Sequence, residues 1–150
     1  MTKETLAHFL LQSLPFFERM RESGLPFMSR FPLSSCEPSS AIVAVALAKR
    51  FPESEIVVVK AYSSNGVSGH FWVEIDGFVV DATAHQFDGF SGPIVQKMPS
   101  PLESTFPFMH RMSIEAAMLG MSEIDYSPGL VKMLGSELLE EVESRTRVAG

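Results

Sequence analysis

The segment Gly69–Ala84 constrains the fold most strongly, because the dipeptide Asp76-Gly77 stands between two runs of alternating side chains. Asp-Gly is one of the preferred pairs at the centre of the two-residue turn that joins neighbouring antiparallel strands. If these two residues form the turn, Ile75 lies opposite Phe78 and the pairing continues outward from there. The sequence therefore predicts a β-hairpin with a defined register.

This register assigns the hairpin side chains to two faces, because neighbouring side chains on a strand point in opposite directions. One face is wholly apolar and suits a core: Phe71, Val73, Ile75, Phe78, Val80 and Ala82. The other face carries His70, Trp72, Glu74, Val79, Asp81 and Thr83. On this second face His70 and Asp81 are diagonal neighbours, with roughly 7 Å between their backbones. An imidazole and a carboxylate can bridge that gap, so the register predicts a hydrogen bond between His70 and Asp81.

The rest of the chain predicts helices around a small sheet. Apolar residues at helical spacing indicate a helix over residues 3–23, kinked or split at Pro15. Ser34 and Glu37 match a capping box, which predicts a helix that has Cys36 in its first turn and runs to Arg50. The remaining expected elements are strands at 56–62 and 94–97, a short helix at 113–119, and a final helix from residue 128 to about residue 146.

Length and composition exclude several classes of protein. A chain of 150 residues is long enough for one core and too short for two, so residues 1–150 are expected to form a single α+β domain. The net charge of −6 argues against a nucleic-acid partner, and no apolar run is long enough to cross a membrane. One cysteine and the lack of a signal-peptide pattern favour a cytoplasmic location. The oligomeric state stays open.

Three residues form a candidate catalytic triad. Cys36, at the expected start of a helix, lies at the positive end of the helix dipole, which favours a thiolate. Asp81 holds one ring nitrogen of His70 and leaves the other free to take a proton. Each residue alone has an ordinary structural explanation, but the only cysteine at a helix start together with a His–Asp pair on one hairpin face favours catalysis. His85 competes as the base if the strand continues beyond Thr83.

The same residues resemble the core of transglutaminase-like proteins, in which a His-aromatic-Trp-Val-Glu hairpin ends in Asp and Thr. The chain has this order in Cys36 with its helix, in Gly69–Gly77 and in Val79–Thr83. The stretch from Asp81 to Phe87 is also similar to small bacterial papain-like proteins and, more distantly, to the leader peptidases of lasso-peptide maturation. The resemblance covers roughly residues 30–90.

This resemblance implies a papain-like fold, with the cysteine helix packed on a small antiparallel sheet and flanked by the N- and C-terminal helices. It also implies a thioester acyl-enzyme formed with a peptide or protein amide, as in peptidases, deamidases and transglutaminases. No cofactor takes part in that chemistry. On this basis Cys36 is the nucleophile, His70 the base and Asp81 its orienting partner.

An oxyanion hole requires two hydrogen-bond donors. The backbone amide of Cys36 at the helix start supplies one. Papain-like enzymes take the other from a glutamine six residues before the cysteine, where this chain has Arg30. Trp72, Gln12 and Asn65 are therefore the candidates for the second donor. For Trp72 the alternative is a ring that packs under the Cys36 helix and shields the triad.

Two other functions stay open at this point. A binding module that keeps the fold without catalysis would use the acidic surface and the nine methionines for protein contacts. A zinc site would use Cys36, His70, His85 and Asp81, whose side chains all ligate zinc, but their spacing matches no short zinc motif. The expectation is therefore no metal, with a peptide or protein amide as the partner.

Overall fold

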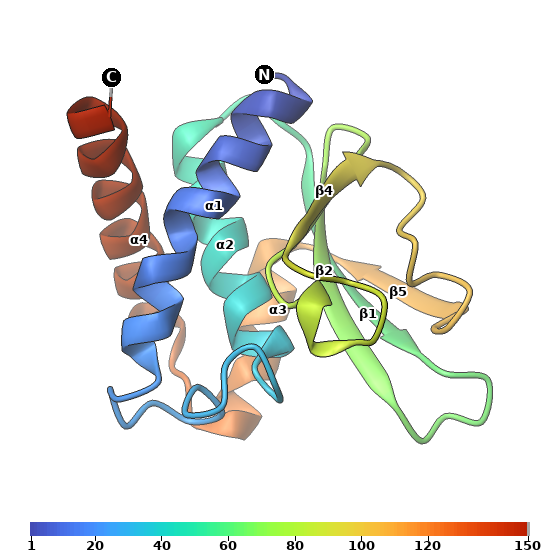
Figure 1. The fold of residues 1–150 in the computed structure, drawn as a ribbon. Helices are drawn as coiled ribbons and strands as arrows, with labels where there is room; N and C mark the ends of the chain where they lie inside the picture. The colour runs from blue at the N-terminus through green and yellow to red at the C-terminus, as the bar shows by residue number, and fades with distance from the viewer. Residues whose placement is uncertain (150) are drawn as a thin grey trace.

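The computed structural model describes residues 1–149 and shows an α+β fold (Figure 1). The helices are α1 (Lys3–Met20), α2 (Cys36–Arg50), α3 (Ile114–Gly120) and α4 (Pro128–Ala149), with short 3₁₀ turns η1 (Ala84–Gln86) and η2 (Met121–Ile124). The strands are β1 (Ile56–Tyr62), β2 (Gly69–Ile75), β3 (Phe78–Asp81), β4 (Ile94–Lys97) and β5 (Phe108–Met112). They form one antiparallel sheet in the order β4-β3-β2-β1-β5. Within residues 1–149, no helix combines the length and the apolarity needed to span a bilayer.

α2 is the central helix, between α4 and the sheet (Figure 1). It packs against β1 and β2, while α1 packs against α4 and β4. Every residue of α2 from Pro38 to Leu47 is buried, which requires neighbours on all sides of the helix. Gly135 of α4 lies directly against α2, since a side chain there would overlap Val45. The glycine therefore allows these two helices to pack closely.

The hairpin predicted from the sequence is present with its predicted register. β2 and β3 are paired so that Ile75 lies opposite Phe78. Asp76 and Gly77 both have positive φ, 45° and 84°, as a type I′ turn requires. The Asp76 carboxylate also accepts a hydrogen bond from the backbone N–H of Glu55 at 2.7 Å. This bond ties the turn to the loop before β1.

The two faces of the hairpin belong to two separate apolar clusters, as the alternation predicts. The face that carries Val73 and Val80 packs against the helices. The other face packs against the segment 84–107, in a cluster formed by Val59, Ala61, Trp72, Val79, Ala84, Leu102 and Phe106. His70 lies on this second face, because its ring contacts the rings of Trp72 and Phe106. The parts of the chain on either side of β4, residues 84–93 and 98–107, therefore cover the histidine.

Three elements differ from the expectation. α1 is one unbroken helix through Pro15, because buried side chains on both sides of the proline anchor it to the core, and it ends at Met20. β5 pairs with the free edge of β1, but three of its five residues are exposed, so it lacks the apolar alternation that indicates a strand. α4 continues three residues beyond residue 146, to Ala149.

β5 contributes a side chain that stabilises a buried carboxylate on the second face. Glu74 is only 4% exposed. Arg111 donates two hydrogen bonds to it, from Nε to Oε1 at 2.6 Å and from Nη2 to Oε2 at 3.2 Å. The indole N–H of Trp72 donates to the same Oε2 at 3.3 Å. The carboxylate is therefore fully paired only while β5 holds its place on the sheet.

We expect Arg111→Ala to lower the free energy of unfolding by about 2 kcal/mol, since it leaves a buried carboxylate paired with the indole alone. The Arg111 side chain is 41% exposed, so water replaces part of the lost interaction. Urea unfolding followed by the fluorescence of Trp72, the only tryptophan, measures the change. Glu74→Gln in the Arg111→Ala background should recover part of the loss. Unchanged stability in Arg111→Ala would contradict this argument.

Candidate active site

Cys36 is the first residue of α2, so the predicted position in the first helical turn is confirmed. The predicted capping box is wrong, because the helix begins one residue later than that motif requires. Ser35 is the N-cap residue and its side chain makes no capping hydrogen bond. Ser34 lies outside the helix with a φ of 60° and turns the chain into it. Because Glu37 is not at the third position after the N-cap, its carboxylate does not complete a capping box.

His70 and Asp81 form the hydrogen bond that the hairpin register predicts. His70 Nε2 lies 2.8 Å from Asp81 Oδ2, and both side chains are almost wholly buried. The second carboxylate oxygen, Oδ1, accepts a hydrogen bond from the backbone N–H of Thr83 at 3.1 Å. A carboxylate in this position requires a proton on Nε2 of the imidazole. The other ring nitrogen, Nδ1, is not held by Asp81 and can exchange a proton with a reacting group.

The thiol of Cys36 is near enough to His70 to influence the pKa of the imidazole. Burial lowers the pKa of His70, but hydrogen bonds with Asp81 and Cys36 and the charges of these two groups outweigh it and raise the pKa to about 9. The proton therefore stays on the imidazole through the neutral range, which suits an imidazolium paired with a thiolate. Cys36 is half-buried and so retains access to solvent.

Aromatic rings enclose His70. The ring of Phe87 meets it edge-on with 4.8 Å between centroids, and the rings of Phe106 and Trp72 lie at 5.8 Å and 5.9 Å. Two of these residues come from the segment that covers the second face of the sheet. They exclude water from the His70–Asp81 pair, which strengthens the electrostatic interaction between the two side chains.

Gln86 also belongs to the site, although no sequence pattern marks its amide as a hydrogen-bond donor there. Its amide Nε2 lies 3.4 Å from His70 Nδ1 and donates a hydrogen bond to Thr83 Oγ1 at 3.2 Å. Gln86 belongs to the turn η1, which directly follows the strand that ends at Asp81. An amide side chain a few residues after the aspartate is the only sequence signal for this role. The Gln86 amide thus lies next to the ring nitrogen that Asp81 does not hold.

The three predicted candidates for the second oxyanion donor have other contacts. The only N–H of the Trp72 indole is used by Glu74, and its ring lies under the segment 84–107 and not under the Cys36 helix. Gln12 lies against Ser144, Arg145 and Val148 of α4. The Asn65 side-chain oxygen accepts hydrogen bonds from Ser63 Oγ at 2.7 Å and from the backbone of Val67 at 3.0 Å, within its own loop. Of these four side chains, Gln86 is the one whose amide lies within hydrogen-bond distance of His70.

His85 does not compete with His70 as a partner of Asp81. β3 ends at Asp81 and the chain then turns in η1, so the alternation that would put residues 81, 83 and 85 on one face is broken. The His85 ring packs edge-on against Phe31, with 6.0 Å between centroids. Its pKa is lowered by burial, against the smaller opposing effects of Asp81 and Glu18.

In the described part of the chain, no group of three or more His, Cys, Asp and Glu side chains is arranged to hold a metal ion.

Glu37 lines a groove of about 600 Å³ beside the start of α2. The other walls come from the sheet, through Lys60 and Phe71, and from the α3–η2 region, through Glu123. Burial raises the pKa of Glu37, Lys60 lowers it, and Glu123 raises it further. The groove therefore carries two carboxylates, one of them from the residue that follows Cys36, together with an ammonium group and an aromatic ring.

Comparison of the chain with protein-family models, with curated proteins and with solved structures finds no match. A functional assignment therefore depends on the geometry around Cys36, His70 and Asp81. That geometry joins a helix terminus to a hairpin and so brings together Cys36 and His70, which lie more than 30 residues apart in the sequence.

Proposed function

We propose that this protein is a thiol-dependent amide hydrolase or acyl transferase of the transglutaminase-like, papain-like class. The observation that carries the proposal is the buried His70–Asp81 hydrogen bond of 2.8 Å beside a cysteine at a helix start. The order of the three residues along the chain supports it, because transglutaminase-like proteins resemble this chain in that order. The antiparallel sheet with α2 packed on it is compatible with a papain-like fold.

In the proposed reaction the Cys36 thiolate attacks the carbonyl carbon of an amide while His70 carries the thiol proton on Nδ1. The tetrahedral intermediate collapses as that proton passes to the leaving nitrogen, and the C–N bond breaks to give a thioester and an amine. Water, or a second amine, then attacks the thioester and loses its proton to His70. Cys36 is released with its thiol proton returned. Asp81 holds Nε2–H throughout and stabilises the imidazolium.

The negative charge on the carbonyl oxygen requires donors in the same space. The backbone N–H of Cys36 is one, because amides in the first helical turn have no acceptor within the helix. We propose the Gln86 side-chain amide as the second, since it lies next to His70 Nδ1 and its N–H loses that acceptor once Nδ1 carries the thiol proton. This donor follows the histidine along the chain, in contrast to the glutamine that precedes the cysteine in papain-like enzymes. Arg30 at that earlier position is then no obstacle to catalysis.

Acylation by 4-nitrophenyl acetate tests the proposal. Wild-type protein should gain one acetyl group on Cys36, read by mass spectrometry, and should release 4-nitrophenol in a burst followed by slower turnover. Gln86→Ala should slow acylation by about 10- to 100-fold and leave iodoacetamide alkylation almost unchanged, because only acylation develops an oxyanion. Cys36→Ala is the blank. Acetylation confined to lysines, or an equal rate in His70→Ala, would favour a non-catalytic binding module.

A further inference from the structure

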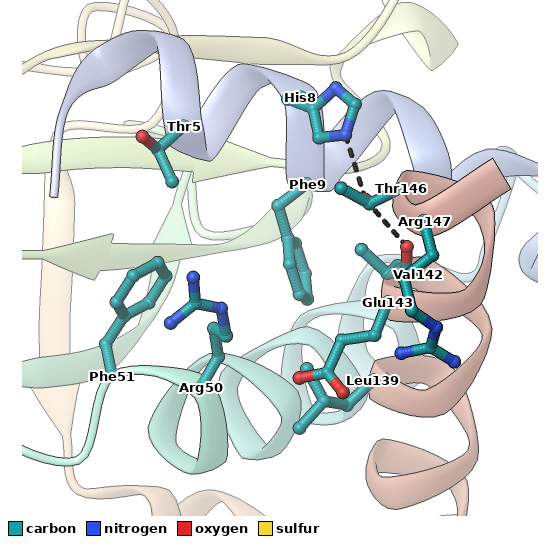
Figure 2. Close-up of a pocket in the computed structure, with 10 residues that line it drawn as sticks. All are labelled: Thr5, His8, Phe9, Arg50, Phe51, Leu139, Val142, Glu143, Thr146 and Arg147. Atoms are coloured by element: carbon teal, nitrogen blue, oxygen red, sulfur yellow. Dashed lines mark hydrogen bonds between the residues drawn. The ribbon is translucent and has the colours of Figure 1, made fainter. Parts of the chain in front are cut away.

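A second cavity lies at the far end of α2 from Cys36. It is bounded by the first half of α1, by the end of α2 and by the C-terminal part of α4 (Figure 2). The length of α2, at 1.5 Å per residue, places it about 20 Å from the thiol. Its volume is about 370 Å³, within the range of small-molecule sites. It is therefore separate from the catalytic groups proposed above.

The floor of this cavity is apolar and its rim is cationic. Phe9, Phe51, Leu139 and Val142 form the floor, and the rim carries Arg50, Arg147 and one carboxylate, Glu143. The walls are joined by a hydrogen bond of 3.0 Å between His8 Nε2 of α1 and Thr146 Oγ1 of α4 (Figure 2). This hydrogen bond holds together the two helices that bound the cavity.

The two guanidinium groups on the rim are available for an anion. Within residues 1–149, neither Arg50 nor Arg147 forms an ion pair, whereas Arg19, Arg111 and Arg145 are all paired with glutamates. The guanidinium carbon of Arg50 lies 4.8 Å from the centroid of the Phe51 ring, which orients it at the edge of the floor. The rim therefore offers two guanidinium groups and one carboxylate to a ligand.

We infer that this cavity binds a small carboxylate with an apolar body. The apolar body lies on the floor beside Phe9 and Leu139, and the carboxylate accepts hydrogen bonds from the guanidinium groups at the rim. A ligand of about ten non-hydrogen atoms matches a cavity of 370 Å³. The inference is independent of the proposed hydrolase chemistry, since none of the lining residues belongs to that site.

Titration with sodium octanoate, followed by backbone amide chemical shifts in the full chain, tests the inference. Saturable shifts confined to the cavity are expected, with a dissociation constant of about 1 mM. Octylamine, which has the same tail and the opposite charge, should bind at least about tenfold more weakly, since it meets the guanidinium groups. Cys36→Ala should bind octanoate as the wild type does.

Charge variants identify the groups that bind the carboxylate. Arg50→Gln and Arg147→Gln should each weaken octanoate binding about threefold, and the double variant about tenfold, as expected of partly exposed ion pairs. Glu143→Gln should strengthen it about twofold, because it removes the one competing carboxylate. Lys132→Gln, at the opposite end of α4, makes the same change in net charge and should have no effect. Equal affinity for octanoate and octylamine, no saturation up to about 10 mM, or unchanged binding in the double variant would overturn the inference.

Discussion

Replacing His70 with alanine should slow the alkylation of Cys36 by iodoacetamide about 100-fold at about pH 6. In the wild type the pKa of His70 is raised to about 9, so the imidazole is protonated at this pH and, in the proposed pair, faces the Cys36 sulfur with a positive charge. A cysteine without such a partner has a pKa of about 8.5 and is less than about 1% ionised there. Cys36 is the only thiol in the chain, so every alkylation event that mass spectrometry detects on a thiol reports on it.

Two further variants separate the roles within the pair. Asp81→Asn should slow alkylation less than His70→Ala, because it perturbs the orientation and charge of the imidazole without removing it. His85→Ala is the matched control. His85 lies in the turn η1 and packs against Phe31, so the alkylation rate of this variant should equal that of the wild type. A wild-type rate that follows an ordinary thiol titration, unchanged in His70→Ala, would mean that no activated pair exists.

The His70–Asp81 pair should also make stability depend on pH. The pKa of His70 rises from its ordinary 6.5 to about 9 in the folded protein, where burial lowers it but the hydrogen bonds and charges of Asp81 and Cys36 prevail. A raised pKa contributes stability that is fully present below about pH 6.5 and is lost as pH rises through about 9. In a Cys36→Ala background, where Asp81 still pairs with the histidine, we expect this loss to be about 2 kcal/mol.

The Cys36→Ala background leaves Asp81 as the partner of His70, so the comparison reports on that pair alone. Urea unfolding at intervals from about pH 6 to about pH 10, in this variant and in Cys36→Ala/His70→Gln, measures the difference. The double variant should show a flatter profile over that interval. Parallel profiles in the two proteins would show that the pKa of His70 is the same in the folded and unfolded states.

The His–Asp pair was predictable because the constraints behind it are local. The Asp76-Gly77 turn sets the register of the two strands, and the pleat then assigns each side chain to a face. These two rules bring His70 and Asp81 together without reference to any other part of the fold. The start of α2 near Cys36 was also predictable, but the capping-box motif placed the N-cap at Ser34, one residue before its position at Ser35.

Other parts of the site depend on how distant segments pack. Gln86 reaches His70 because the chain leaves β3 in a 3₁₀ turn, and neither its amide nor the turn has a periodic pattern. Arg111 reaches Glu74 from β5, an edge strand with mostly exposed residues. Trp72 and Gln12 have side chains that can donate to an oxyanion, but in the fold Trp72 donates to Glu74 and Gln12 lies beside α4.

The sequence by itself determined the hairpin, its two faces and the pairing of His70 with Asp81, because turn chemistry and strand alternation act over a few residues. Only the tertiary structure decided what surrounds that pair. The aromatic cover of His70, the amide of Gln86 beside it and the interaction with Cys36 all come from segments outside the hairpin. Their positions follow from burial of apolar surface across the whole chain, which the local pattern of any one segment does not specify.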